Sequence, residues 1–227
     1  MSGLFFDNTG IQLSQIYNKK TLNIFCDASI IKRNNITTGC YGVVAVCMDD
    51  IIDSIYKQVS NTTSNNSEVK GLRAALSLAN KYKYNFPIIN IFSDSQISVF
   101  GLRDYIYNWK YNIHDGLLYG SADKPIKNQE IFIECYHLMN TIKHAKLNIF
   151  HQSGHIDNKY ENIKKASMVF SRSNNIHGTV DLNLIRYIST YNNYVDQTSR
   201  SLLRRSNLSL LYEDPILFVS KGKISRQ

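Results

Sequence analysis

The hydrophobic and polar positions of residues 21–29 alternate as they do in a half-buried strand. One side of this segment carries Leu, Ile and Cys, and its apolar stretch ends on a carboxylate, Asp27. Residues 39–48 and 51–60 are rich in Val, Ile and Tyr, and two turn-prone aspartates separate them. The pattern therefore predicts three consecutive antiparallel strands.

A helix and a central strand are predicted next. Residues 62–83 begin with Ser and Asn, which cap helices, and then place apolar residues at helical spacing, with Glu68 expected in the first turn. After Pro87, residues 88–95 are apolar on both faces, which is typical of a strand buried in the middle of a sheet. This segment also reaches a carboxylate, Asp94, at its end.

Helical patterns then alternate with one more strand. Residues 96–110 and 128–144 have helical spacing, and residues 145–155 predict a fifth strand that runs into a loop. The last helix is predicted over residues 192–205. These elements predict an α/β fold: a five-stranded mixed sheet, three antiparallel strands followed by parallel strands, flanked by helices.

A chain of 227 residues favours one domain with additions over two domains. We expect residues 1–20 to be a polar N-terminal extension and residues 21–205 to form the domain. An insertion at about 158–190 is rich in Asn, Lys, Ser and Ile and shows no clean period, so its structure stays open. Residues 206–227 form a C-terminal tail with an apolar middle.

The composition is that of a globular protein, since 43% of the residues are hydrophobic and 19% are charged. This excludes disordered and fibrous classes. Lys and Arg number 26 against 18 Asp and Glu, which gives a net charge of +8 and a pI near 9.2. Such a balance suits a polyanionic partner such as nucleic acid, but many basic proteins only have a solvated basic surface.

Neither the cysteines nor the hydrophobic runs indicate a special environment. The four cysteines have no CxxC spacing, so we expect reduced structural residues rather than a zinc or redox site. The N-terminus lacks the basic segment followed by an apolar run that is typical of a signal peptide. No stretch reaches the ~18 apolar residues needed to cross a bilayer. We expect a soluble, intracellular and cytoplasmic protein with no membrane partner. The abundance of Asn, Ile, Lys and Tyr suggests an AT-rich genome, such as that of a virus or phage.

Four acidic residues stand at the ends of predicted strands or at the starts of predicted helices. If the strands that end on Asp27 and Asp94 are parallel neighbours, both carboxylates emerge at one edge of the sheet, where Glu68 and Asp196, expected at helix starts, can join them. Each acid alone has an ordinary interpretation, as a turn former or as a partner of the helix dipole. This ordinary interpretation fits Asp27 and Asp94 less well, because each ends an apolar strand where a buried charge is costly.

Four carboxylates at one point imply a cation. Like charges that lie close together raise one another's pKa, and hard divalent ions relieve this repulsion. The expected cofactor is therefore Mg²⁺. Two ions about 3.5–4 Å apart would stabilise the attacking water and the leaving oxygen of a displacement at phosphorus.

The motifs around these acids resemble a known family. FCDAS, TTSNNSE, FSDSQ and NNYVDQTSR resemble, in order, the four acidic motifs of type 1 ribonuclease H. GLRDYIYNWK followed by ADKPIKNQEIF is similar to that family's helix and basic handle, which grips the DNA strand of a hybrid. The resemblance covers roughly residues 22–158 and 192–205 and implies a ribonuclease H-like fold.

The resemblance also implies roles for individual residues. The metal-binding acids would be Asp27, Glu68, Asp94 and Asp196. Residues that contact the hybrid near the cut would be Asn65, Ser95 and Gln96, with Thr63 at a phosphate-contacting position. The handle would use Trp109, Lys110, Lys124 and Lys127 to hold sugar and phosphate without reading sequence. For Trp109, packing in the core is the alternative.

The sequence departs from the family's pattern in four places. ASIIKRNNITTG stands where the family has a Gly-rich loop, and the handle has lost basic residues. The loop HQSGHIDN offers two candidates for the family's catalytic His, of which we prefer His151 over His155, although it is one residue out of register. A His there could pass a proton to the leaving group. The insertion separates His151 from Asp196, where the family has a short loop.

The resemblance implies a metal-dependent enzyme, an endonuclease that hydrolyses the RNA strand of RNA–DNA hybrids with two Mg²⁺ ions, which Mn²⁺ can replace. It would leave 5′-phosphate and 3′-hydroxyl ends. Two alternatives stay open. One is a non-catalytic module that binds hybrid or RNA, which the presence of all four acids disfavours; the other is a DNA-cleaving, resolvase-like nuclease of the same superfamily. Protein partners and oligomeric state are not predicted.

Overall fold

A computed structural model describes residues 10–205, and residues 1–9 and the tail at 206–227 lie outside the described part. Its strands are β1 (Gly10–Ile11), β2 (Thr21–Arg33), β3 (Ile36–Cys47), β4 (Asp50–Ser60), β5 (Ile88–Ser93), β6 (Lys110–Asn112), β7 (Leu117–Tyr119), β8 (Lys146–His151) and β9 (Thr179–Val180). Its α-helices are α1 (Leu13–Ile16), α2 (Ser64–Tyr82), α3 (Gln96–Phe100), α4 (Gln129–Thr141), α5 (Tyr160–Ser173) and α6 (Leu182–Arg205).

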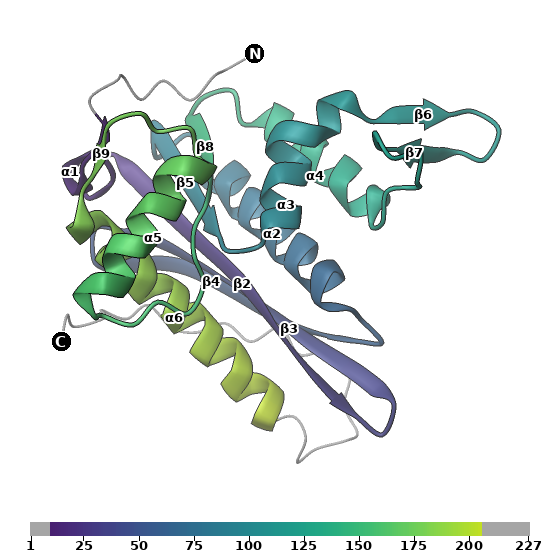
Figure 1. The fold of residues 1–227 in the computed structure, drawn as a ribbon, viewed down its shortest axis with the longest axis horizontal. Coiled ribbons are helices and arrows are strands. Elements are labelled where there is room, and N and C mark those ends of the chain that lie inside the picture. The colour runs from purple at the N-terminus through teal and green to yellow at the C-terminus, as the bar shows by residue number, and fades with distance from the viewer. Residues whose placement is uncertain (1–9, 206–227) are drawn as a thin grey trace.

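The central sheet has five strands in the order β4-β3-β2-β5-β8. β2 pairs with β3, and β3 with β4, in antiparallel fashion, whereas β2–β5 and β5–β8 are parallel. The predicted mixed sheet and its α/β class are therefore confirmed. A separate short hairpin, β6–β7, projects from the body of the molecule after α3 (Figure 1).

Helices cover both faces of the sheet (Figure 1), which separates two apolar cores. Alternate residues of β2 point to opposite faces: Leu22 and Ile24 pack with α2 and α4, whereas Phe25 packs with α5 and α6. On this second face the rings of Phe25, Phe92 and Phe150 stack across three neighbouring strands with centroids 5.1 Å apart. Burial on both faces explains the near-continuous apolar sequence of β5.

Three buried asparagines cross the sheet as a ladder. Asn23, Asn90 and Asn148 occupy the same register on β2, β5 and β8. The Asn148 amide donates to Asn90 Oδ1 at 2.8 Å, and the Asn90 amide donates to Asn23 Oδ1 at 3.0 Å. Asn23 in turn donates to the carbonyl of Ile16 at 2.8 Å, so the ladder also ties α1 to the sheet.

The segment predicted as a polar N-terminal extension packs into the second core from residue 10 onward. Ile11 and Ile16 are fully buried, and β1 pairs in parallel with β9. Gly10 has a φ of +95°, and a Cβ there would lie 2.0 Å from the Thr179 carbonyl oxygen, so the pairing requires glycine. The apolar pattern that includes Ile11 and Ile16 is too short to predict from the sequence that this segment is buried.

The inserted segment at about 158–190 has regular structure. It contains α5, β9 and the first turns of α6. The prediction that the last helix begins at residue 192 is wrong, because α6 begins at Leu182. Leu184, Ile185 and Ile188 are buried at helical spacing and continue the apolar face of the helix in the N-terminal direction.

The helix predicted over residues 96–110 is only partly regular. It begins as α3, passes through a π-helical turn at Gly101–Tyr105 and a 3₁₀ turn at Ile106–Asn108, and ends before Trp109. None of the helices within residues 10–205 is both long and apolar enough to cross a membrane.

Candidate active site

Two of the predicted acids lie at the same edge of the sheet. Phe25 and Phe92 are paired in register on the parallel strands β2 and β5, and Asp27 and Asp94 each come two residues later. The exposed fraction of Asp27 is 8%. Its Oδ1 accepts from the backbone N–H of Ala28 at 2.6 Å, whereas its buried Oδ2 has no hydrogen-bond partner among the described residues.

Glu68 reaches this edge from α2. Its Oε2 accepts from the Ser95 hydroxyl at 2.6 Å and its Oε1 from the Ser64 hydroxyl at 3.0 Å. Because Ser95 directly follows Asp94, this hydrogen bond ties the helix to the end of β5. The prediction that Glu68 lies in the first helical turn is wrong: α2 begins at Ser64, capped by Thr63, and its first turn contains no acid.

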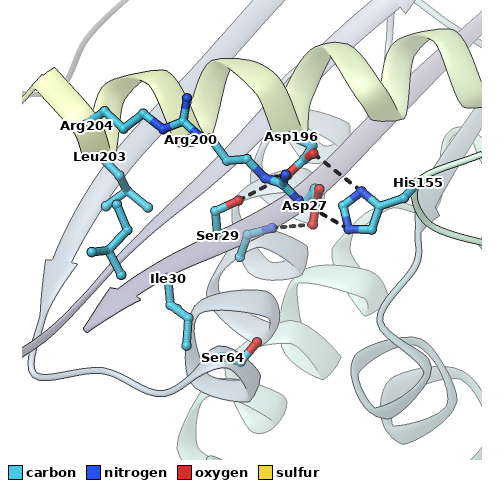
Figure 2. Close-up of a pocket in the computed structure, with 11 residues that line it drawn as sticks. Asp27, Ser29, Ile30, Ser64, His155, Asp196, Arg200, Leu203 and Arg204 are labelled. Carbon is cyan, nitrogen blue, oxygen red and sulfur yellow. Dashed lines mark hydrogen bonds and ion pairs between the residues drawn. The ribbon is translucent and has the colours of Figure 1, made fainter. Parts of the chain in front are cut away.

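Asp196 arrives from the opposite core, on α6 (Figure 2). Its exposed fraction is 6%, and its Oδ1 accepts from Arg200 Nε at 2.7 Å and from the Ser29 hydroxyl at 3.1 Å. Its Oδ2 lies 3.5 Å from His155 Nδ1. The longer α6 places Asp196 well inside the helix, which corrects the expectation that it stands at the helix start.

The four acids act on one another electrostatically. Burial raises the pKa of Asp27 to about 8, and the negative charges of Asp94, Asp196 and Glu68 add to the effect. Burial and the charges of Glu68 and Asp196 also raise the pKa of Asp94, which the neighbouring His155 partly counters. The sequence prediction that these side chains gather is therefore consistent with their mutual influence in the fold.

This environment suits a divalent cation, although the side chains do not form a ready set of ligands. No group of three or more His, Cys, Asp or Glu side chains in residues 10–205 is arranged to hold a metal ion. Asp196 is engaged by Arg200, and Glu68 by two serines. Even so, the unpartnered Oδ2 of Asp27 and its raised pKa mark a buried carboxylate that lacks a counter-charge, which a hard cation would supply.

The two candidate histidines occupy different environments. His151 is the last residue of β8 and is 3% exposed, its Nε2 lies 3.2 Å from the backbone oxygen of Asp94, and burial lowers its pKa. His155 is exposed, and its ring faces Asp196 on one side and Arg200 on the other, with Nε2 3.3 Å from the Arg200 guanidinium (Figure 2). Of the two, His155 is therefore the more accessible to a substrate, whereas the preferred candidate, His151, is enclosed at the end of β8.

The predicted substrate-contacting residues fall into two groups. Near the acids, Thr63 caps α2, Asn65 follows in its first turn, and Ser95 and Gln96 begin α3. Ser95 is buried against Glu68, whereas Gln96 is exposed.

The second group lies on the projecting hairpin and its flanks. Lys110, Lys124 and Lys127 are exposed there. Trp109 is half-buried and packs edge-on against Phe132, with ring centroids 5.1 Å apart. Its indole therefore contributes to packing, as the alternative interpretation proposed.

Three residues at the site were not predicted from the sequence. Ser29, Ser64 and Arg200 line a pocket of about 360 Å³ together with Asp27, Asp196 and His155 (Figure 2). Ser64 and Arg200 were detectable, because each stands four residues from an acid of the same helix, a spacing at which side chains meet. Ser29 had no such signal, because its contact depends on packing of α6 against β2.

Comparison with known proteins agrees with the fold. A family model described as RNase H matches residues 19–169, which include Asp27, Glu68 and Asp94 but end before Asp196. The chain is 30% identical over 145 residues to the ribonuclease HI of Haemophilus influenzae, covering 63% of this chain and 84% of that protein. It is 34% identical over 115 residues to the ribonuclease H of Actinobacillus succinogenes, covering 51% and 68%.

Among solved structures, the foamy viral protease-reverse transcriptase in complex with an RNA/DNA hybrid aligns with a TM-score of 0.51 at 14% identity. The alignment covers 77% of this chain and 22% of the viral protein, and at this identity it supports the fold alone. The family match over all five strands of the central sheet and three of the acids is the stronger finding. The chain therefore belongs to the ribonuclease H family.

Proposed function

We propose that this protein is an endonuclease that hydrolyses the RNA strand of RNA–DNA hybrids with the help of two divalent metal ions, Mg²⁺ or Mn²⁺. The family generally uses divalent ions. The observation that carries the proposal is the buried carboxylate of Asp27, which has an unpartnered oxygen and three further acids as electrostatic neighbours. Such a group is costly unless a cation completes it.

Asp27, Glu68, Asp94 and Asp196 would hold the ions. When bound, the ions would supply an activated water and charge stabilisation at the leaving 3′ oxygen. The protein's own contribution is to fix the acids from four elements, β2, α2, α6 and the end of β5, so that little rearrangement is needed during the reaction. Arg200 donates to Asp196 Oδ1 at 2.7 Å, so a cation held by that oxygen would displace the guanidinium.

We assign the proton-transfer role to His155 instead of His151. Its imidazole is exposed, lies beside Asp196 and can reach a phosphate in the pocket. Proton delivery to the leaving 3′ oxygen would give 3′-hydroxyl and 5′-phosphate ends.

The hybrid would be recognised at two places. Thr63, Asn65, Ser95 and Gln96 lie around the acids, where polar side chains can bond the phosphates and 2′-hydroxyls of the cut strand. Lys110, Lys124 and Lys127 on the hairpin region would contact phosphates of the DNA strand. In support, the viral relative named above was solved with an RNA/DNA hybrid bound.

Cleavage assays on three labelled substrates test the proposal. With Mg²⁺ present, we expect the RNA strand of an RNA–DNA hybrid to be cut, while duplex RNA and duplex DNA of the same sequence stay intact. Cleavage of duplex DNA instead would favour a resolvase-like nuclease. Hybrid binding without cleavage, in Mg²⁺ or Mn²⁺, would favour a binding module and contradict the enzyme assignment.

The raised pKa of Asp27 makes stability depend on pH and metal. Its folded-state pKa of about 8 exceeds the ordinary value of 3.8, so the protonated form favours folding. This stabilisation is complete below the ordinary pKa and is lost as the pH rises through about 8. In EDTA, we expect the unfolding free energy of the wild type to fall from pH 5 to pH 8 relative to that of Asp27→Asn.

Urea titrations at each pH measure this difference, and Mg²⁺ should reduce it at pH 8 because binding to the folded state offsets the buried charge. Parallel pH profiles for the two proteins in EDTA would contradict the assigned environment of Asp27.

A further inference from the structure

Strand β8 lies at the edge of the central sheet in the described structure, and a side chain takes the place of a further strand beside its last residue. Asn174, which follows α5 and is 1% exposed, accepts from the backbone N–H of His151 at 3.0 Å. Its amide donates to the His151 carbonyl at 2.7 Å and to the Phe170 carbonyl at 2.8 Å. The inserted helix is thus bonded to both backbone groups of His151.

Arg103 completes this connection from the π-helical turn after α3. Its guanidinium donates to Asn174 Oδ1 at 2.9 Å, to the Ser173 carbonyl at 2.8 Å and to the Ile149 carbonyl at 3.4 Å. The guanidinium carbon lies 5.2 Å from the centre of the Phe100 ring, which holds it in place. We call Asn174 and Arg103 together the β8 clamp.

The clamp leads directly to the acids. The ring Nε2 of His151 lies 3.2 Å from the backbone oxygen of Asp94, and the next N–H, that of Gln152, donates to the Ser93 carbonyl at 3.0 Å. Gly154 then passes so near Asp94 that a Cβ would lie 2.2 Å from its Oδ2. His155 follows. Fixing His151 therefore fixes both the backbone of Asp94 and the loop that carries His155.

We propose that the β8 clamp is a positioning device for the active site, through which the inserted helix α5 holds Asp94 and the loop at 152–155 in place. Asn174 and Arg103 touch none of the reacting atoms and act through His151. The proposal rests on the role proposed above for Asp94 and His155. It gives the segment between His151 and Asp196 a function in catalysis, beyond its contribution to the second core through Ile163 and Phe170.

Asn174→Asp is the sharpest test, because it preserves shape but turns an amide donor toward the carbonyls of His151 and Phe170 into an acceptor. We expect kcat for hybrid cleavage to fall about 10-fold to 100-fold, the range for groups that orient metal ligands, with KM for the hybrid little changed. The Mg²⁺ concentration for half-maximal rate should rise. Arg103→Lys, which keeps the charge but loses the fork, should lie between this variant and the wild type.

Amide hydrogen exchange gives a readout independent of activity. In Asn174→Asp, the amides of residues 151–155 should exchange about 10-fold faster or more, while those of β2 and β5 change only as far as global stability does. The matched control is Ser171→Ala, which removes a hydrogen bond from Ser171 to the Ile176 carbonyl within the same segment and leaves the clamp intact. It should change neither exchange at 151–155 nor the Mg²⁺ dependence.

The proposal is overturned if Asn174→Asp and Ser171→Ala behave alike in exchange and in Mg²⁺ dependence, or if all loss of rate follows the folded fraction. Should Asn174→Asp fail to fold, Arg103→Lys provides the same comparison. The variant Asp94→Asn distinguishes failure of the clamp proposal from failure of the proposed function. If that variant cleaves at the wild-type rate, the metal role of Asp94 is wrong, while hydrogen exchange still reports whether the clamp holds the loop.

Discussion

Asp27→Asn is expected to lower the rate of hybrid cleavage by about 1,000-fold or more while preserving hybrid binding. The amide has nearly the shape of the carboxylate but no charge, so it cannot attract a divalent cation. Metal ions contribute several kcal/mol of charge stabilisation in such reactions, and about 1.36 kcal/mol corresponds to each factor of ten. Single-turnover cleavage in Mg²⁺ measures the rate, and fluorescence anisotropy with a labelled hybrid in EDTA measures binding.

Asp157→Asn is the control. Asp157 is exposed, follows the loop at 152–155 and takes no part in the site. It should cleave at the wild-type rate. A wild-type rate for Asp27→Asn would refute the assignment of the acids. A loss of both cleavage and hybrid binding would instead place Asp27 in substrate contact.

Gly154→Ala is expected to reduce cleavage by about 100-fold although it removes no functional group. The added methyl would meet the Asp94 carboxylate, with 2.2 Å to Oδ2 and 3.2 Å to Cγ, so the carboxylate or the loop must move. Misplacement by about 1 Å can cost a factor of this size in an enzyme. Steady-state rates at several Mg²⁺ concentrations, with circular dichroism to confirm folding, measure the effect.

Gly71→Ala in α2 provides the matched comparison. A Cβ at Gly71 would make ordinary contacts, the nearest at 3.5 Å from the Tyr41 Cβ, and alanine suits a helix interior better than glycine. We expect normal activity and equal or higher stability. If Gly154→Ala also keeps full activity, the approach of the loop to Asp94 does not matter for the reaction.

The sequence predicted the sheet and the common edge of Asp27 and Asp94, because the strands that lead to these residues have clear local patterns. The alternation in β2 and the continuous apolar run of β5 specify their burial, and a parallel pairing then brings Asp27 and Asp94 to one edge. Glu68 was placed one turn too early because several Ser and Asn residues before it could cap the helix, whereas the cap is Thr63, which precedes them.

The parts that the sequence did not predict depend on contacts between distant segments. Ile11 and Ile16 are buried only because β9 and α6 cover them. The contacts of Asn174 likewise follow from packing of the inserted segment against β8. The start of α6 at Leu182 follows from burial of the next residues, Leu184 and Ile185, in the core that also contains Ile11 and Ile16. For the same reason the sequence favoured His151 over His155 without showing that His151 is buried and His155 is exposed.

The asparagine ladder also determines how Asp27 and Asp94 are positioned relative to each other. Asp27 and Asp94 each stand four residues beyond their own ladder asparagine, Asn23 and Asn90. If β5 slid by one residue against β2, a primary amide would face apolar side chains without a partner, and one acid would turn to the opposite face. The hydrogen bonds between these buried amides thus set the register of the two strands at a distance from the active site. The folded chain therefore aligns the two carboxylates before a cation or a nucleic acid binds.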